Sequence, residues 1–224
     1  NYIKAISDNP TILNNFISSL VISVISTAAT VLCASMAVYG FSRKNVYGKV
    51  IMYNLILCTL MVPISALVIP ITQLNSRMGL LDNYFGLIFP YIALNIPYAV
   101  TILQGFMKGV PVEIEESAYI DGASLPKRFA SVVFPLLQPA IVSCVITQGL
   151  WIWNDYFYPM VFISKKAQYS LPVGMLQFLG DKENPAQWNI LFAACVLCAL
   201  PLIIVFLALQ KQFVNGIAAG AVKG

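Results

Sequence analysis

Five long apolar segments dominate the chain and limit what it can fold into. They cover residues 16–41, 50–71, 85–107, 140–163 and 189–209, and each reaches the roughly 20 apolar residues that a membrane-spanning helix needs. Four contain no Asp, Glu, Lys or Arg, and the segment 140–163 contains only Asp155. Charged residues make up 10% of the chain, against about 25% in soluble domains. The sequence therefore predicts an all-α polytopic membrane protein with five spans.

The distribution of basic residues predicts the side of the membrane on which each loop lies. Eight of the 13 Lys and Arg residues fall on the side of the loop 108–139 and the C-terminal tail 210–224, and five fall on the other side. Because Lys and Arg near span ends favour the cytoplasm, we expect this loop and the tail to be cytoplasmic and residues 1–15 to be external. The net charge of +4 is then a topology signal, and no nucleic-acid partner is expected.

The loop 108–139 has the pattern of two short helices joined at a glycine. Pro111 and the three glutamates that follow it suit the first turn of a helix, where the helix dipole favours negative charge. Gly122 can adopt the left-handed conformation that closes a helix. Apolar residues on one side of the next stretch predict a second helix, which Pro135 should end. An ordinary amphipathic loop is the alternative interpretation of this pattern.

The residues of this loop resemble the EAA motif of ABC importer permeases. The motif reads EAA, three residues, Gly, nine residues and Ile-x-Leu-Pro. The chain has Glu116-Ser117-Ala118, then Gly122, and a run that ends in Phe134-Pro135. It departs from the motif at three positions, each of which keeps a small or apolar side chain: Ser117 for Ala, Val132 for Ile and Phe134 for Leu.

The resemblance extends over essentially all 224 residues. The flanking sequence 119–123 and the ending 219–224 are similar to the carbohydrate branch of the family, specifically to the second permease subunit of maltose-type oligosaccharide importers. The resemblance implies the transmembrane domain of a type I ABC importer. Such subunits usually carry six spans, so we expect residues 1–15 to be the end of an external segment that follows a further span.

The family's properties imply a function and a set of partners. The chain would be the membrane-spanning permease subunit of an ATP-driven sugar or oligosaccharide importer in a bacterial or archaeal cell (inner) membrane. Its partners would be membrane lipid, a homologous second permease, a cytoplasmic ATPase dimer and an extracellular sugar-binding protein. The partner ATPase would hold ATP and Mg, and this chain would hold no cofactor and would not be an enzyme. The residues that would couple it to the ATPase are Glu116, Ser117, Ala118, Asp121, Gly122 and Pro135.

Polar and aromatic residues inside the apolar segments suggest a path for a neutral, polar substrate. Amide side chains donate and accept hydrogen bonds as sugar hydroxyls require, and aromatic faces stack on the apolar face of a sugar ring. The candidates for the translocation path are Asn54, Asn95, Gln148, Trp151, Asn154 and Asp155.

Asp155 leaves a second class of transporter open. As an ionised acid it would cost roughly 2.5–3.5 kcal/mol facing lipid at the centre of a span, so it should face protein, an interface or water. We favour a structural hydrogen-bonding role over direct substrate contact. In an ion-coupled secondary transporter or channel, the same carboxylate would be the coupling or selectivity group.

The sequence offers little for catalysis or metal binding. It contains no histidine and no Gly-rich phosphate loop, so no catalytic residue and no metal site are expected. The five cysteines lie within apolar segments, where free Cys packs as a small hydrophobe. Cys195 and Cys198 have the spacing of a redox or metal motif, but on an apolar helix we interpret them as packing residues.

Overall fold

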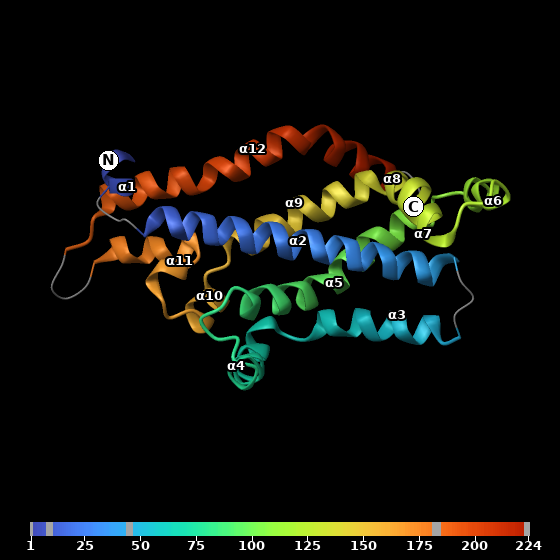
Figure 1. Ribbon diagram of the computed structural model, residues 1–224. Helices are drawn as coiled ribbons and strands as arrows, with labels where there is room; N and C mark the ends of the chain where they lie inside the picture. Colours follow the sequence, from blue (N-terminus) through green and yellow to red (C-terminus); the bar gives the residue numbers. More distant parts are fainter. Residues whose placement is uncertain (1, 8–10, 44–46, 181–184, 222–224) are drawn as a thin grey trace. The chain divides into compact units, whose positions relative to one another are not determined.

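The regular structure of the protein is helical throughout the residues that the structure describes. The computed structural model describes residues 2–7, 11–43, 47–180 and 185–221, and no strand occurs among them. The short helix α1 (Tyr2–Ser7) precedes three uninterrupted helices that are long and apolar enough to cross a membrane. These are α2 (Ile12–Arg43), α5 (Phe85–Met107) and the part of α12 (Trp188–Ala221) that ends at Gln210 (Figure 1). The predicted all-α architecture is confirmed.

The predicted span 50–71 is not one continuous helix. It begins as α3 (Lys49–Cys58) and a 3-10 turn (Thr59–Met61), and it resumes as a second 3-10 turn (Ile64–Leu67) and α4 (Val68–Arg77). Val62 between them is extended, with φ −81° and ψ 122°. Pro63 explains the break, because a proline disfavours helical backbone at the residue before it.

The loop 108–139 forms the two predicted short helices, but the second does not end at Pro135. The first is α6 (Val112–Ile120); α7 (Leu125–Arg128), a π-helical turn (Phe129–Val133) and α8 (Phe134–Leu136) follow it. Pro135 lies inside α8, and the chain bends by 74° before α9 (Gln138–Asn154). In the π turn, the Phe134 N–H bonds to the Phe129 carbonyl five residues back. This wider turn accommodates the ring of Pro135, which would clash with the preceding turn of a regular α-helix.

The predicted span 140–163 is also interrupted. Helix α9 stops at Asn154, and a short helix α10 (Phe157–Phe162) begins after Asp155 and Tyr156. A 3-10 turn (Lys166–Gln168), α11 (Leu171–Met175) and a further 3-10 turn (Leu176–Leu179) lead towards α12. The Asp155 side chain accepts a hydrogen bond from the Phe157 N–H at 3.0 Å, which replaces a helical bond at the interruption.

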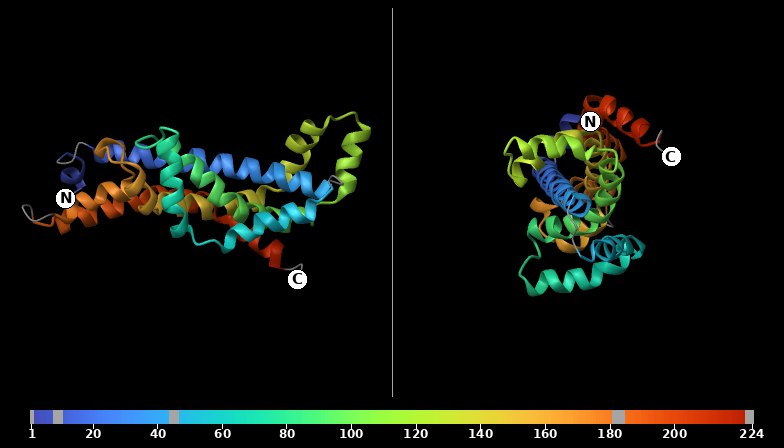
Figure 2. Two further views of the ribbon diagram at one scale, coloured as in Figure 1. Left: turned by 90° about the horizontal axis from the view of Figure 1, so that it is seen from below. Right: turned by 90° about the vertical axis from the view of Figure 1, so that its right-hand side faces the viewer.

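The chain divides into two compact units, and α2, α5, α9 and α12 each contribute one part to both. Unit 1 comprises Asn1–Ser26, Ile64–Tyr91 and Gln148–Ala208, and unit 2 comprises Thr27–Pro63, Ile92–Thr147 and Leu209–Gly224. In unit 2, the short helices α6 and α7 lie at the same end as the last turns of α2 (Figures 1 and 2).

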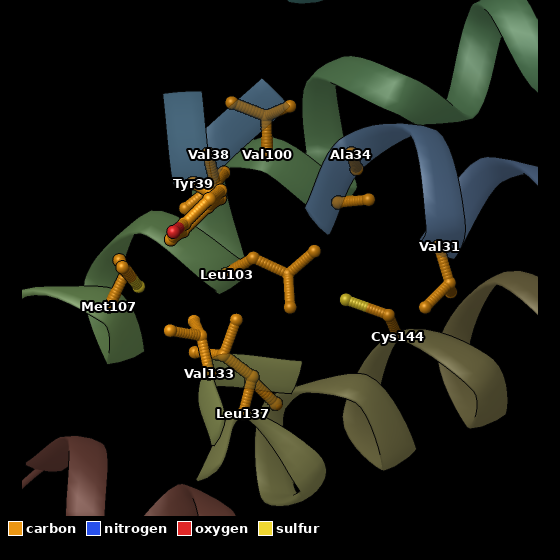
Figure 3. Packing of buried hydrophobic residues seen from close by; sticks show 12 residues of the cluster. Val31, Ala34, Val38, Tyr39, Val100, Leu103, Met107, Val133, Leu137 and Cys144 are labelled. Carbon is orange, nitrogen blue, oxygen red and sulfur yellow. The ribbon is translucent and has the colours of Figure 1, made fainter. Parts of the chain in front are cut away.

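The core of unit 2 is an aliphatic cluster formed by α2, α5, α9 and the chain that leads into α9. Figure 3 shows Leu103 of α5 between side chains of α2 and the stretch 133–144. Tyr39 of α2 lies at the edge of this cluster and packs against Phe129, with ring centroids 5.3 Å apart. The fully buried members are Ala34, Val38, Ala99, Val100, Leu103, Val133, Leu137, Ala140 and Cys144.

The core of unit 1 joins the start of α2 to α9, α11 and α12. Trp153 is buried there, packs edge-on against Phe16 at 5.6 Å and donates from Nε1 to the Cys198 carbonyl at 3.2 Å. The other buried members are Ile12, Leu171, Phe178, Ile190, Ala194 and Cys198. The outer face of α12 leaves Ile203, Ile204, Phe206 and Leu207 exposed, as expected of a helix that faces lipid or another subunit.

Asp82 fastens the turn before α5 to the chain that leaves α10, also within unit 1. Its N–H donates to the Phe162 carbonyl at 2.9 Å, and its carboxylate accepts from the Ser164 hydroxyl at 2.8 Å. Asp82 adopts φ +57°, a left-handed conformation that Asp tolerates better than most residues. Hydrogen bonds from the Ser164 backbone and side chain hold the pKa of Asp82 below its usual range.

Helix α11 lies against the first turns of α2, and this contact requires a glycine. The Leu171 N–H donates to the Ser19 hydroxyl at 2.7 Å. A Cβ atom added at Gly174 would lie 2.2 Å from the terminal amide of buried Asn15 and 3.0 Å from its Cγ. Gly174 therefore allows the two helices to approach closely.

We expect Gly174→Ala to lower the thermal melting temperature of the detergent-purified protein, because overpacking of a close contact costs about 1–3 kcal/mol. The matched control is Gly105→Ala in α5, where an added Cβ meets nothing within 4 Å. That change should leave the melting temperature equal or raised, since Ala is the better helix former. Equal melting of Gly174→Ala and the wild type would contradict the described packing.

Candidate functional site

The turn between α6 and α7 has the backbone conformation that the sequence predicts. Gly122 has φ +78°, and the Ala123 N–H donates to the Ala118 carbonyl at 3.0 Å, which closes the end of α6. A Cβ added at Gly122 would meet no atom within 4 Å. Glycine is therefore required at position 122 because of the positive φ angle, and not because a larger side chain would clash.

The predicted coupling residues of α6 form one accessible surface around this turn. Glu116, Ser117, Asp121 and Gly122 are exposed, and Ala118 is half-buried. The Ser117 hydroxyl donates to the Glu113 carbonyl at 2.8 Å, so its hydrogen bond stays within α6. The structure thus brings five of the six predicted residues together. Pro135, also exposed, lies apart from them in the sequence, within α8.

Exposed apolar side chains extend this surface along α6. Val112 and Ile114 are about half exposed, at 45% and 44%, and Tyr119 and Ile120 reach 65% and 84%. Large apolar groups exposed on a short polar loop are typical of a surface that a partner covers.

Glu115 is a buried residue of the loop that the sequence did not single out. It is buried, and three groups surround its carboxylate. Arg43 Nε lies 3.1 Å from Oε2, Arg128 Nη1 lies 3.5 Å from Oε1, and the Tyr39 hydroxyl donates to Oε1. We call Glu115, Arg43, Arg128 and Tyr39 the Glu115 cluster. It joins the end of α2 to both short helices.

The two arginines make further contacts that hold the loop. Arg43 Nη2 donates to the Val110 carbonyl at 2.7 Å, just before α6 begins. The Arg128 guanidinium lies 4.9 Å from the centre of the Tyr119 ring. Removing one partner of a buried ion pair typically costs about 3–5 kcal/mol, because the remaining charge stays buried. The charge of Glu115 is thus a structural requirement of this junction.

The other predicted polar residues fall into different environments. Trp151 and Asp155 meet at Tyr91, whose hydroxyl donates to Asp155 Oδ2 at 2.6 Å and whose ring packs edge-on against Trp151 at 5.7 Å. Asn154 is exposed and donates to the Leu150 carbonyl of its own helix at 2.8 Å. Asp155 therefore acts as a hydrogen-bond acceptor within unit 1.

Tyr158 belongs to the same aromatic group and is not among the residues predicted for the translocation path. Its ring centroid lies 6.1 Å from that of Tyr91, and its hydroxyl donates to the Ile64 carbonyl at 2.9 Å. Outside this group, Asn54 is exposed on α3, while Asn95 in α5 and Gln148 in α9 are buried.

The described residues contain no set of three His, Cys, Asp or Glu side chains that could hold a metal ion. The five cysteines are free, with Cys144 and Cys198 buried and Cys33, Cys58 and Cys195 exposed.

Comparison with known proteins identifies the family. The sequence model of the family described as "Binding-protein-dependent transport system inner membrane component" matches residues 26–218. The chain belongs to this family. It is therefore a membrane component of a transport system that works with a binding protein.

Individual relatives cover almost the whole chain. The melibiose/raffinose/stachyose import permease protein MelC of Bacillus subtilis (strain 168) is 32% identical over 212 residues, which cover 94% of this chain and 76% of MelC. The trehalose/maltose transport system permease protein MalG of Thermococcus litoralis is 31% identical over 228 residues, which cover 100% of this chain and 81% of MalG. Permease proteins of transport systems are thus similar to this chain along its length.

A solved structure shares the fold. The crystal structure of a bacterial ABC transporter involved in the import of the acidic polysaccharide alginate contains a chain with a TM-score of 0.83 and 20% identity. The match covers 95% of this chain and 78% of that chain. The transmembrane fold of an ABC importer permease, expected from the EAA-like loop, is confirmed.

We expect Asp155→Asn to retain most transport, because the amide keeps the size of the side chain, its oxygen can accept from the Phe157 N–H, and its NH2 group can donate to the Tyr91 hydroxyl oxygen. Asp155→Leu should lower the yield of folded protein, since each buried polar group left without its partner costs about 1–3 kcal/mol. Uptake assays and size-exclusion profiles of both variants check this. An ion-coupled carrier predicts the reverse for the first variant: a normally folded protein without transport.

Proposed function

We propose that this chain is the permease subunit of an ATP-driven importer of sugars or oligosaccharides. The observation that carries the proposal is the family match over residues 26–218. The names of relatives supply the substrate class: import of melibiose, raffinose and stachyose, and transport of arabinooligosaccharides and of trehalose and maltose. Asn, Gln and aromatic side chains within the helices suit a neutral, polar substrate of this kind.

The energy source lies on another chain in this proposal. The sequence has no Gly-rich phosphate loop, so a partner ATPase dimer holds ATP and Mg, and this chain carries no cofactor and catalyses no reaction. A homologous second permease completes the translocation path, and an extracellular sugar-binding protein delivers the substrate. The loop 108–139 and the C-terminal tail face the cytoplasm, as the excess of basic residues on that side supports. The end of the tail, residues 222–224, lies outside the described residues.

The surface of α6 is the docking site for the ATPase in this proposal. Residues 116–121 lead into the turn at Gly122. Exposed Tyr119 and Ile120 offer apolar area that a cleft on the partner would bury. ATP-driven closure of the ATPase pair would displace α6 and switch the permease between inward- and outward-open states by rigid-body movement. The exposed position of Glu116 and the half-buried position of Ala118 support this docking role.

The sequence alone left open an ion-coupled transporter that uses Asp155. A specific observation weighs against it, because both oxygens of that carboxylate already accept hydrogen bonds, from Tyr91 and from the Phe157 N–H. The Asp155 carboxylate is thus suited to stabilise the backbone where the helix is interrupted after α9.

Gly122→Val should release the ATPase or uncouple its hydrolysis from sugar uptake, because left-handed backbone costs an ordinary L-residue about 1–2 kcal/mol. Ala118→Trp should do the same by adding bulk to the docking surface. Gly122→Asn is the matched control, since Asn tolerates the left-handed region, and it should retain most coupling.

The measurements are co-purification of the ATPase with each permease variant, and ATP hydrolysis and uptake for a panel of sugars. Wild-type retention and uptake in both Gly122→Val and Ala118→Trp would mean that the loop is only a connector. The proposed coupling role would then be wrong.

A further inference from the structure

Glu115 is a charged residue that α6 buries and does not present to a partner. We propose that the Glu115 cluster is the mechanical joint that fixes α6 to the end of α2, so that a displacement of α6 moves α2. This inference rests on the proposed function, and it assigns positioning roles to Glu115, Arg43, Arg128 and Tyr39 that lie beyond the docking surface itself.

Helix α2 holds both oxygens of the Glu115 carboxylate. Tyr39 and Arg43 are one turn apart, so they project from the same face of α2. The Tyr39 hydroxyl donates to Oε1, and Arg43 Nε lies 3.1 Å from Oε2. Arg43 also binds the Val110 carbonyl at 2.7 Å, ahead of α6. Two residues of α2 thus hold the loop at its entry and in the first turn of α6.

Arg128 ties the second short helix to the same carboxylate. Its Nη1 lies 3.5 Å from Glu115 Oε1, and its guanidinium lies over the ring of Tyr119 on α6. The two helices hinged at Gly122 are therefore linked across the hinge as well as through it. A push on the exposed face of α6 is resisted by α7 and is passed to α2.

Burial makes this joint stiffer than a surface ion pair. The side chains of Glu115, Arg43 and Arg128 are only 7%, 10% and 19% exposed. Charges shielded from water are screened less by salt and interact more strongly than surface pairs. Tyr39 also belongs to the aliphatic cluster of unit 2, where Figure 3 shows it beside Val38 and above Met107.

Helix α2 is suited to receive the displacement. It is continuous from Ile12 to Arg43, and Arg43 is its last residue. A movement imposed at Arg43 is therefore a movement of a whole helix and not of a flexible tail. A purely structural cluster would stabilise the loop in the same way, and only a measurement that separates coupling from folding distinguishes the two roles.

The test uses the complete transporter, reconstituted with its ATPase, second permease and binding protein. Glu115→Gln keeps the size of the side chain and removes its charge. We expect the ATPase to stay bound and to hydrolyse ATP, while the amount of sugar imported per ATP falls about 2- to 30-fold, the range for residues within a coupling network. The matched control is Glu113→Gln on the exposed part of α6, which should keep the wild-type ratio.

If Glu115→Gln folds poorly, exchanging the charges of residues 43 and 115 tests the same coupling role. Arg43→Glu and Glu115→Arg should each uncouple hydrolysis from uptake. The double variant keeps one carboxylate and two guanidinium groups in the cluster, so it should recover several-fold more import per ATP than either single variant.

Three results would overturn the proposal: a wild-type ratio in Glu115→Gln, a parallel loss of hydrolysis and uptake, or a double variant no better than the single ones. Failure of the proposed function would look different. The wild-type complex itself would then show no ATP-dependent uptake.

Discussion

The buried carboxylate of Glu115 determines where the polar loop of this protein can lie. An ionised group shielded from water is tolerated only beside opposite charges and hydrogen-bond donors. Arg43 at the end of α2, Arg128 in α7 and the Tyr39 hydroxyl provide them. Because Arg43 ends a long apolar helix, the carboxylate holds α6 at that end of α2. The exposed surface around Gly122, through which we propose that the ATPase acts, owes its position to this pairing.

A second constraint shapes the interrupted helices. Within a membrane no water can satisfy free backbone groups, so side chains must do so wherever a helix breaks. Asp155 accepts from the Phe157 N–H after α9 ends, and Tyr158 donates to the Ile64 carbonyl just beyond Pro63. Tyr91 then fixes Asp155. The hydrogen bonds of the lone acid in the apolar segments are thus a structural reason for its presence at the break after α9.

The sequence predicts the features that depend on local chemistry. Uninterrupted apolar stretches predict α2, α5 and α12, and the left-handed angle of Gly122 follows from its place after an acidic helical turn. The predicted spans 50–71 and 140–163 do not show the breaks at Val62 and Asp155, because hydropathy alone does not register a lost backbone hydrogen bond. The position of Pro135 inside α8 was also missed, since a π turn that accommodates proline leaves no clear pattern in the residues.

The sequence does not show that Glu115 is the buried glutamate and that Glu113 and Glu116 are exposed. All three are acidic residues in one short helix, and only the fold brings Arg43 and Arg128 to one of them. The excess of basic residues on the side of this loop served as a topology signal, but two of them are also structural partners. Pairing between residues far apart in the chain depends on the packing of α2 against the loop, which no local pattern encodes.

The most direct test of this account is sugar uptake into proteoliposomes that contain the assembled transporter, with ATP enclosed on the side of the ATPase and with ionophores that collapse all ion gradients. The account predicts uptake that requires hydrolysable ATP and binding protein and that continues when the gradients are gone. Uptake that proceeds without ATP and stops when the ionophores are added would contradict it.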